Sequence, residues 1–178
     1  MISLSIARKY ARALLAIGLK EGNYEALGKD LEKVAALLRE NKELQSILMS
    51  AVYPVATRKG IAKRVCEPLA LAKSTADFIA LLIERERIDH FFEIGKSYES
   101  LSDVVGNRLR ATLVTAMSLS PQLVGGNKSQ LESSTQKEVI LSVEEDPSLI
   151  GGVLTKIGNV IYDGSLRTQL LKIKENLY

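Results

Sequence analysis

Apolar residues in the first hundred positions recur every three or four residues, which is the spacing of an amphipathic helix. Between residues 6 and 19 they form one continuous stripe of Ala7, Tyr10, Ala11, Leu14 and Leu15. Further helical stripes begin near residues 24, 43, 54, 75 and 88, and the last of them continues to residue 105. Ile61, Val65 and Leu69 are expected on the inward side of the fourth helix, and Ser74 or Thr75 at the cap of the fifth. Because short connections force neighbouring helices to pack against each other, residues 1–105 predict a six-helix antiparallel bundle.

The pattern changes after Gly106-Asn107. Residues 109–116, 139–143, 152–157 and 160–162 alternate or are rich in β-branched side chains, so they predict strands. Ser120-Pro121 predicts the start of a helix, although Gly125-Gly126 would weaken it by roughly 1 kcal/mol per glycine. Residues 166–177 predict a closing helix with an apolar side. Residues 106–178 are therefore expected to form a small α/β domain, and the whole chain an α+β fold of two domains.

The charges exclude some partners. The 178 residues are 25% charged and 46% hydrophobic with a net charge of +3, and both signs are interleaved, as in Glu84-Arg85-Glu86-Arg87. Nucleic-acid binders gather cations that no nearby acidic residue neutralises, so no nucleic-acid partner is expected. A nucleic-acid-binding protein is a weaker alternative, which a steep salt dependence of DNA or RNA binding would support. No apolar run approaches the roughly 20 residues that span a bilayer, so no direct membrane insertion is expected.

The residues of catalytic chemistry are sparse. The single cysteine, Cys66, cannot form an internal disulfide, which points to a reducing compartment. The only histidine, His90, is far from it in sequence, so a buried apolar role for Cys66 is favoured over a reactive thiol. The glycines at 151, 152 and 158 lead into strands and carry no phosphate-loop signature. We expect no catalytic, cofactor-binding or metal-binding residues; an enzyme using Cys66 or the acidic turn Glu144-Glu145-Asp146 is a weaker alternative.

Two motifs carry a family resemblance. Residues 146–153 (DPSLIGGV) and 157–167 (IGNVIYDGSLR) closely resemble the C-terminal signature of the delta subunit of the F-type ATP synthase, whose mitochondrial counterpart is the oligomycin-sensitivity-conferring protein. Residues 7–14 (ARKYARAL) resemble the opening helix of that family. The chain departs from the family at Tyr162, Leu166 and Gly125-Gly126. The signature positions are Asp146, Pro147, Gly151, Gly152, Gly158, Asp163, Gly164, Ser165 and Arg167.

The resemblance implies a non-catalytic stator subunit of the proton-translocating ATP synthase, with no cofactor. Such a subunit links the catalytic head to the peripheral stalk, so that rotation is coupled to ATP synthesis. Its bundle receives the N-terminal helix of an alpha subunit between the first and fifth helices. The candidate contacts are Ala7, Tyr10, Ala11, Leu14, Phe78, Leu81, Leu82 and Arg85. The same stripes must also supply the core of the bundle, and which side of each is open is not determined by the sequence.

The second domain is implied to bind the b-type stalk subunits, and our hypothesis places that surface within residues 153–177. For the signature glycines an architectural role, a turn and a bent strand, is favoured. The basic and acid-free N-terminus also fits a transit peptide, but its stripe favours the first helix of the domain. The chain therefore looks bacterial and is expected at the cytoplasmic face of the inner membrane, as a peripheral protein. A processed organellar homologue and a free-standing adaptor with the same folds remain alternatives.

Overall fold

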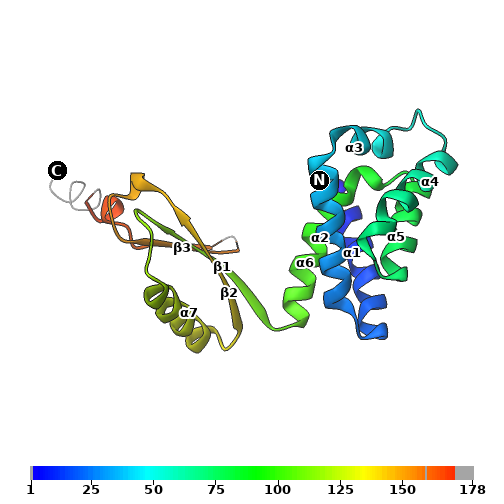
Figure 1. Cartoon of the computed structure of the whole chain (residues 1–178). Coiled ribbons are helices and arrows are strands. Elements are labelled where there is room, and N and C mark those ends of the chain that lie inside the picture. The colour runs from blue at the N-terminus through cyan, green and yellow to red at the C-terminus, as the bar shows by residue number, and fades with distance from the viewer. Residues whose placement is uncertain (1, 159, 171–178) are drawn as a thin grey trace. The chain divides into compact units, whose positions relative to one another are not determined.

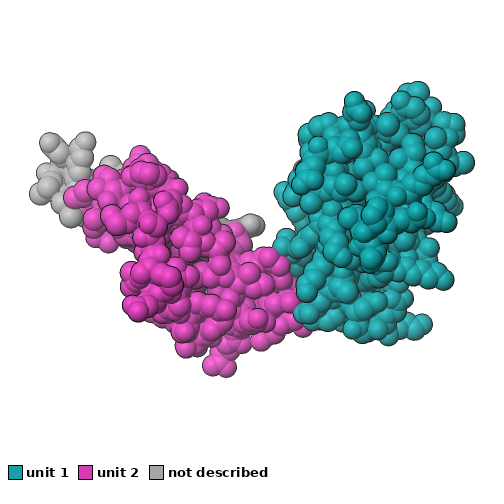
Figure 2. Space-filling view, viewed as in Figure 1, with its two compact units in different colours: residues 1–102 teal, residues 103–178 magenta. Residues whose placement is uncertain are grey.

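The chain folds into two compact units, residues 1–102 and residues 103–178 (Figure 2). The structure is a computed structural model, and it describes residues 2–158 and 160–170. Helices and one four-stranded sheet make up the described residues, so the chain is of the α+β class, as predicted.

The first unit is helical throughout (Figure 1). Its helices are α1 (Ile2–Glu21), α2 (Tyr24–Glu40), α3 (Lys42–Met49), α4 (Val55–Cys66), α5 (Lys73–Glu84) and α6 (Phe91–Val105), the last of which continues into the second unit. Short 3₁₀ turns, Glu67–Leu69 and Ile88–His90, precede α5 and α6. The breaks fall at the residues that favour them, since Gly22 has a φ of +71° and Pro54 directly precedes α4.

The core of the first unit is the set of apolar stripes. Buried apolar side chains come from all six helices, including Ala62 of α4, and those of α6 include Phe91, Ile94 and Tyr98. The Tyr98 hydroxyl donates a hydrogen bond of 2.7 Å to the Tyr24 carbonyl. Desolvation raises the pKa of Tyr98 to about 12, so the phenol stays protonated at neutral pH and keeps donating across the α2–α6 contact.

The N-terminus of α5 differs from the prediction. Ser74 or Thr75 is the cap expected from the sequence, but the residue at the cap position is Ala72, which has no capping side chain. The carboxylate of Asp30, a buried residue of α2, takes this role instead. Asp30 Oδ2 accepts hydrogen bonds from the Ala72 backbone N–H at 2.8 Å and from Thr75 Oγ1 at 3.3 Å. A carboxylate at this position also interacts favourably with the helix dipole.

The second unit is built around a sheet with the strand order β2-β1-β3-β4. The strands are β1 (Arg108–Thr115), β2 (Glu138–Glu145), β3 (Val153–Ile157) and β4 (Val160–Asp163). β1 and β2 are parallel and are connected by α7 (Pro121–Thr135), while β3 and β4 pair antiparallel. Ala111, Leu113 and Val114 of β1 are buried, and α7 packs against β2 (Figure 1).

The end of α6 is tied to the start of β1 inside the second unit. The carboxylate of Asp103 lies 2.6 Å from Arg110 Nε and 3.6 Å from Arg108 Nε. Between them Asn107 turns the chain with a φ of +51°, a conformation that asparagine tolerates better than most residues. Its side-chain amide donates to the Gln136 carbonyl at 3.1 Å. The predicted break at Gly106-Asn107 is thus held by the contacts of Asp103 across it and by the hydrogen bond from Asn107 to the end of α7.

The closing helix is described only at its start. Residues 166–170 are helical, and the remainder of the predicted helix, residues 171–177, lies outside the described residues. Ser165, which is buried, precedes it, and Ser165 Oγ accepts a hydrogen bond from the Thr168 N–H at 3.3 Å. This is the arrangement of a helix N-cap.

Removing the glycines of α7 should stabilise the second unit. The helix runs through Gly125 and Gly126, and a Cβ at either position would meet no atom within 4 Å. Because alanine loses less backbone entropy, we expect Gly125→Ala and Gly126→Ala each to raise the free energy of unfolding by about 0.5–1 kcal/mol. Urea unfolding of the full chain would measure this.

The matched control is Gly18→Ala in α1, where a Cβ would lie 2.8 Å from the Tyr24 Cα. That substitution should destabilise the chain, because the contact is with backbone and cannot be relieved by a rotamer change. A loss of stability from the α7 substitutions would mean that α7 needs the flexibility of its glycines.

Candidate partner-binding surfaces

Burial divides the positions predicted to bind an alpha-subunit helix into two groups. Five of them lie in the core of the first unit and are not accessible on the closed bundle: Ala7, Ala11, Leu14, Phe78 and Leu82. The other three reach the surface. Tyr10 is half-buried, Leu81 is 40% exposed and Arg85 is exposed.

The accessible positions lie along one side of α1 and of α5. The rings of Tyr10 and Phe78 meet edge to face with centroids 6.3 Å apart, so the two helices adjoin there. Leu81 and Arg85 are three and seven residues beyond Phe78, on the same side of α5. Ile17, seven residues beyond Tyr10, is also exposed. Tyr10, Ile17, Leu81 and Arg85 are called the α1/α5 face below.

Ile17 is absent from the residues predicted from sequence. The sequence does indicate that Ile17 lies on an apolar surface, because Tyr10, Ala13 and Ile17 form a second apolar line at i, i+3, i+7 spacing beside the buried stripe. A helix whose apolar arc is wider than its buried arc has apolar surface left for a partner.

Polar contacts hold the helices at the borders of this face. Ser74 Oγ on α5 donates to the carboxylate of Glu21 at the end of α1, 2.7 Å from Oε2. That hydrogen bond and a second from Asn23 lower the pKa of Glu21. On the other side Lys59 of α4 is hydrogen-bonded to Glu84 of α5, which lowers the pKa of Glu84. Both carboxylates therefore stay ionised and keep these contacts at neutral pH.

In the second unit, the first part of the family signature forms a turn held by Asp146. Its backbone N–H donates to the Thr115 carbonyl at the end of β1 at 2.7 Å, and its Oδ1 accepts from the Ser148 N–H at 3.0 Å. Pro147 then opens the 3₁₀ turn Pro147–Leu149, whose Leu149 is buried. Hydrogen bonding from Ser148 lowers the pKa of Asp146, with smaller contributions from the charges of Arg167 and Lys156.

The second part of the signature packs its backbone directly against the first. The Gly164 N–H donates to the Val153 carbonyl at 3.0 Å, and the Leu166 N–H donates to the Gly151 carbonyl at 2.9 Å. Gly152 has a φ of +82°, and a Cβ there would lie 2.5 Å from the Gly164 carbonyl oxygen. Asp163 Oδ1 accepts from the Ser165 N–H at 2.8 Å. The motif thus joins β3 to the start of the closing helix by backbone contacts.

A second group of exposed apolar side chains lies within or directly after the two parts of the signature. It comprises Ile150, Val160, Ile161, Tyr162, Leu166 and Leu170, called the β4 surface below. Because side chains alternate along a strand, Val160 and Tyr162 project from one side of β4 and Ile161 from the other. β4 is an edge strand of the sheet. Ile150 has a φ of +65°, which is an outlier for a β-branched residue, and strain of this kind clusters at functional sites.

The structure assembles no catalytic constellation in its described part. Burial raises the pKa of the Cys66 thiol, which disfavours the reactive thiolate. His90 lies 3.6 Å from the carboxylate of Asp89, the residue before it in the chain. Among the described residues no group of three His, Cys, Asp or Glu side chains could hold a metal ion. None of the described helices combines the length and apolarity needed to span a membrane.

Known proteins resemble the chain over its full length. Residues 6–177 match the family described as ATP synthase delta (OSCP) subunit. ATP synthase subunit delta of Geobacter metallireducens is 40% identical over 177 residues, which cover 99% of this chain and 98% of the relative. That of Desulfatibacillum aliphaticivorans is 37% identical over 177 residues, covering 99% and 97%.

The fold is also found among solved structures. A chain in the cryo-EM structure of the Toxoplasma gondii mitochondrial ATP synthase hexamer superposes with a TM-score of 0.72, covering 96% of both chains at 19% identity. Family profile and relatives agree with the resemblance of the two motifs. The chain therefore belongs to the ATP synthase delta (OSCP) subunit family.

Proposed function

We propose that this chain connects the catalytic head of an F-type ATP synthase to its peripheral stalk through one apolar surface on each unit. Membership of the family makes the chain a non-catalytic stator component of the synthase. The observation that carries the finer proposal is the presence of exposed apolar side chains in each unit, the α1/α5 face and the β4 surface. A free-standing adaptor is not favoured, because the family match covers nearly the whole chain.

In this proposal the two units act as two domains. Residues 1–105 form a six-helix antiparallel bundle that binds the head, and residues 106–178 form a small α/β domain that binds the stalk. Two moderate interfaces in one chain raise the effective concentration of the second contact once the first has formed. The stator can then resist the torque of the rotor without a single very tight interface.

The α1/α5 face suits an incoming helix. Tyr10 and Leu81 offer apolar surface above the buried Phe78, and Arg85 adds a cation at one border. An amphipathic helix binds such a face by burying its own apolar stripe, with anchors at i, i+3, i+4 and i+7. We assign this face to the N-terminal helix of an alpha subunit. The buried positions Ala7, Ala11, Leu14, Phe78 and Leu82 support the face from beneath.

The β4 surface is assigned to the b subunits of the stalk. Its members lie on the edge strand β4, in the described start of the closing helix and, for Ile150, directly after the 3₁₀ turn Pro147–Leu149; their large apolar side chains are exposed. Exposed apolar clusters of this kind mark protein interfaces. The chain would then sit on the cytoplasmic face of the bacterial inner membrane as a peripheral member of the complex.

Leu81→Asp tests the head contact. We expect the affinity of the full chain for a peptide from the N-terminus of the cognate alpha subunit to fall at least about tenfold, because a carboxylate would be desolvated in an apolar interface. Isothermal calorimetry at several temperatures would measure this. A negative heat-capacity change of binding to the unmodified chain is the sign of buried apolar surface.

Val52→Asp is the matched control, since Val52 is 86% exposed between α3 and α4, outside the α1/α5 face. It should leave the affinity unchanged. Binding of the b subunits should be unaffected by Leu81→Asp, because that contact is assigned to the other unit. Equal affinity of the Leu81→Asp and unmodified chains, both folded by circular dichroism, would refute the assignment of the α1/α5 face.

A further inference from the structure

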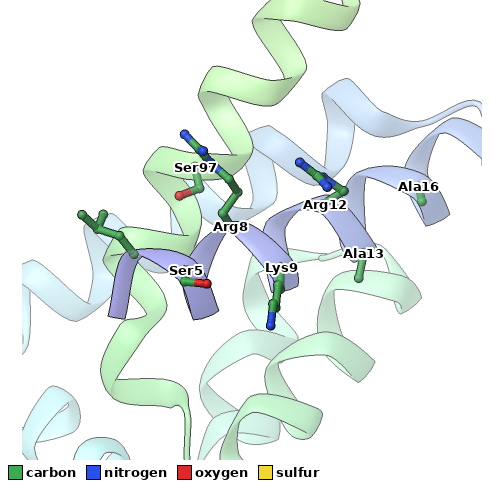
Figure 3. A pocket seen from close by; sticks show the side chains of 8 residues that line it. Ser5, Arg8, Lys9, Arg12, Ala13, Ala16 and Ser97 are labelled. Atoms are coloured by element: carbon green, nitrogen blue, oxygen red, sulfur yellow. The ribbon is translucent and has the colours of Figure 1, made fainter. Parts of the chain in front are cut away.

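A groove runs along the outward side of α1 beside α6 (Figure 3). Its lining includes Arg8, Lys9 and Arg12 of α1, together with Ser5, Ala16 and Ser97. Ser97 is contributed by α6, so the groove is formed by two helices. Arg8 lies next to Ser97, and Arg12 follows one turn further along α1 (Figure 3).

The charge of this groove is not balanced by the described part of the chain. Arg8, Lys9 and Arg12 are all exposed, and no described acidic side chain forms an ion pair with them. Elsewhere in the first unit, by contrast, Lys33 is paired with Asp30 and Lys59 with Glu84. Cations gathered in a groove create a positive potential that attracts negatively charged partners.

The spacing of these cations also lowers the stability of α1. Arg8 and Arg12 are four residues apart, and like charges at this spacing on a helix repel each other. An anionic partner would remove this repulsion. The spacing of about one helical turn matches two acidic residues four apart on a second helix, so two carboxylate–guanidinium pairs could form in register.

We propose that this groove binds an acidic amphipathic helix of a partner protein. The small side chains of Ser5, Ala13 and Ala16 permit a close approach of the partner's backbone, and Ser97 adds a hydroxyl for hydrogen bonding. A bilayer surface fits less well, because the site is a groove and its only large exposed apolar side chain is Leu4. The inference goes beyond the proposed function, since Tyr10 and Ile17 of the α1/α5 face do not line this groove.

The test uses the full chain and two amphipathic helical probe peptides of about 20 residues. One carries Glu at every fourth position and the other carries Gln at the same positions. Heteronuclear NMR titration of the labelled chain should show saturable shifts on α1 and α6 with the Glu peptide only. Raising the salt concentration from about 50 to about 200 mM should weaken this binding several-fold.

Arg8→Glu combined with Arg12→Glu should lower the affinity for the Glu peptide at least about tenfold, since two attractive pairs become repulsive. Lys20→Glu, at the last turn of α1 and outside the groove, is the matched control and should change it less than about twofold. Ser97→Phe fills the groove from α6 without changing any charge. It should weaken binding too, and it keeps the test decisive if the double variant does not fold.

Three results would overturn the proposal. The first is equal affinity for the Glu and Gln peptides, and the second is a set of shifts that map away from α1 and α6. The third is binding of phosphatidylglycerol vesicles that is tighter than peptide binding and is abolished by the double reversal, because the groove would then be a lipid contact.

Discussion

Replacing Asp30 by alanine is expected to lower the free energy of unfolding of the first unit by about 3 kcal/mol. The side chain is buried in α2, and its carboxylate accepts from the Ala72 N–H at 2.8 Å and from Thr75 Oγ1 at 3.3 Å. Alanine would leave the buried Thr75 hydroxyl and the half-buried Ala72 N–H without this acceptor, and the N-terminus of α5 without a cap. Amide hydrogen exchange should then show loss of protection concentrated in α5.

Two control variants distinguish the capping hydrogen bonds of Asp30 from its negative charge and its ion pair with Lys33. Asp30→Asn keeps a side-chain oxygen that can accept from the Ala72 N–H, so it should lose less than half as much stability. Lys33→Ala removes the ion-pair partner 3.1 Å from Asp30 Oδ1 but leaves the cap intact. Because Lys33 is largely exposed, that change should stay within about 0.5 kcal/mol. An equally small effect of Asp30→Ala would show that the contact does not stabilise α5.

The Asp30 contact marks a limit of prediction from sequence. Apolar periodicity placed the helices close to their observed bounds, because a buried stripe leaves a direct trace in the sequence. The cap of α5 joins residues 42 positions apart, and no local pattern reports such a pair. Ser74 and Thr75 were the right residue types for a cap, but a carboxylate from another helix occupies that place.

Arg58 is a second residue whose burial and partners the sequence pattern did not predict. The pattern of α4 predicted an inward line of Ile61, Val65 and Leu69, yet Ile61 and Val65 are only half-buried and Arg58 is buried. Its guanidinium donates from Nη1 to the Leu48 carbonyl at 3.4 Å and lies 3.7 Å from a Glu86 carboxylate oxygen. A buried charge is tolerated only where partners are present, and those partners come from α3 and from the turn after α5.

The candidate surfaces, too, were predicted only in part from the sequence. Periodicity selected the stripes of α1 and α5, but it could not say which flank neighbouring helices cover. Ala7 and Ala11 are fully buried whereas Tyr10, between them in sequence, reaches the surface. The signature motif and the family match indicate the role of the chain. The apolar stripes do not, since stripes of this kind occur in any helical bundle.

The strands were predictable from alternation, but the pairing of β1 with β2 and β3 was not. β1 pairs in parallel with β2 and antiparallel with β3, so the sheet places a strand between two others that follow it in sequence. Register depends on which faces are buried and on the turn geometry. The Gly151-Gly152 segment contributes to that geometry, because it returns the chain to β3 beside the turn at Gly164.

Gly152→Ala should therefore destabilise the second unit by about 3 kcal/mol. A left-handed conformation costs an alanine roughly 1–2 kcal/mol relative to glycine, and Gly152 has a φ of +82°. The added Cβ would also lie 2.5 Å from the Gly164 carbonyl oxygen and 2.9 Å from the Ser165 Cα. Relieving such backbone contacts would separate β3 from the start of the closing helix, at an added cost of about 1–3 kcal/mol. Urea unfolding of the full chain would measure the loss.

Gly158→Ala separates the two contributions to this effect. Gly158 has a φ of +56°, but a Cβ there would meet no atom within 4 Å. Its substitution should therefore cost only the conformational part, about 1 kcal/mol. Equal losses at the two positions would mean that conformation alone explains the glycine at 152. A clearly larger loss at 152 would show that the signature requires glycine there because two backbone segments meet with no room for a side chain.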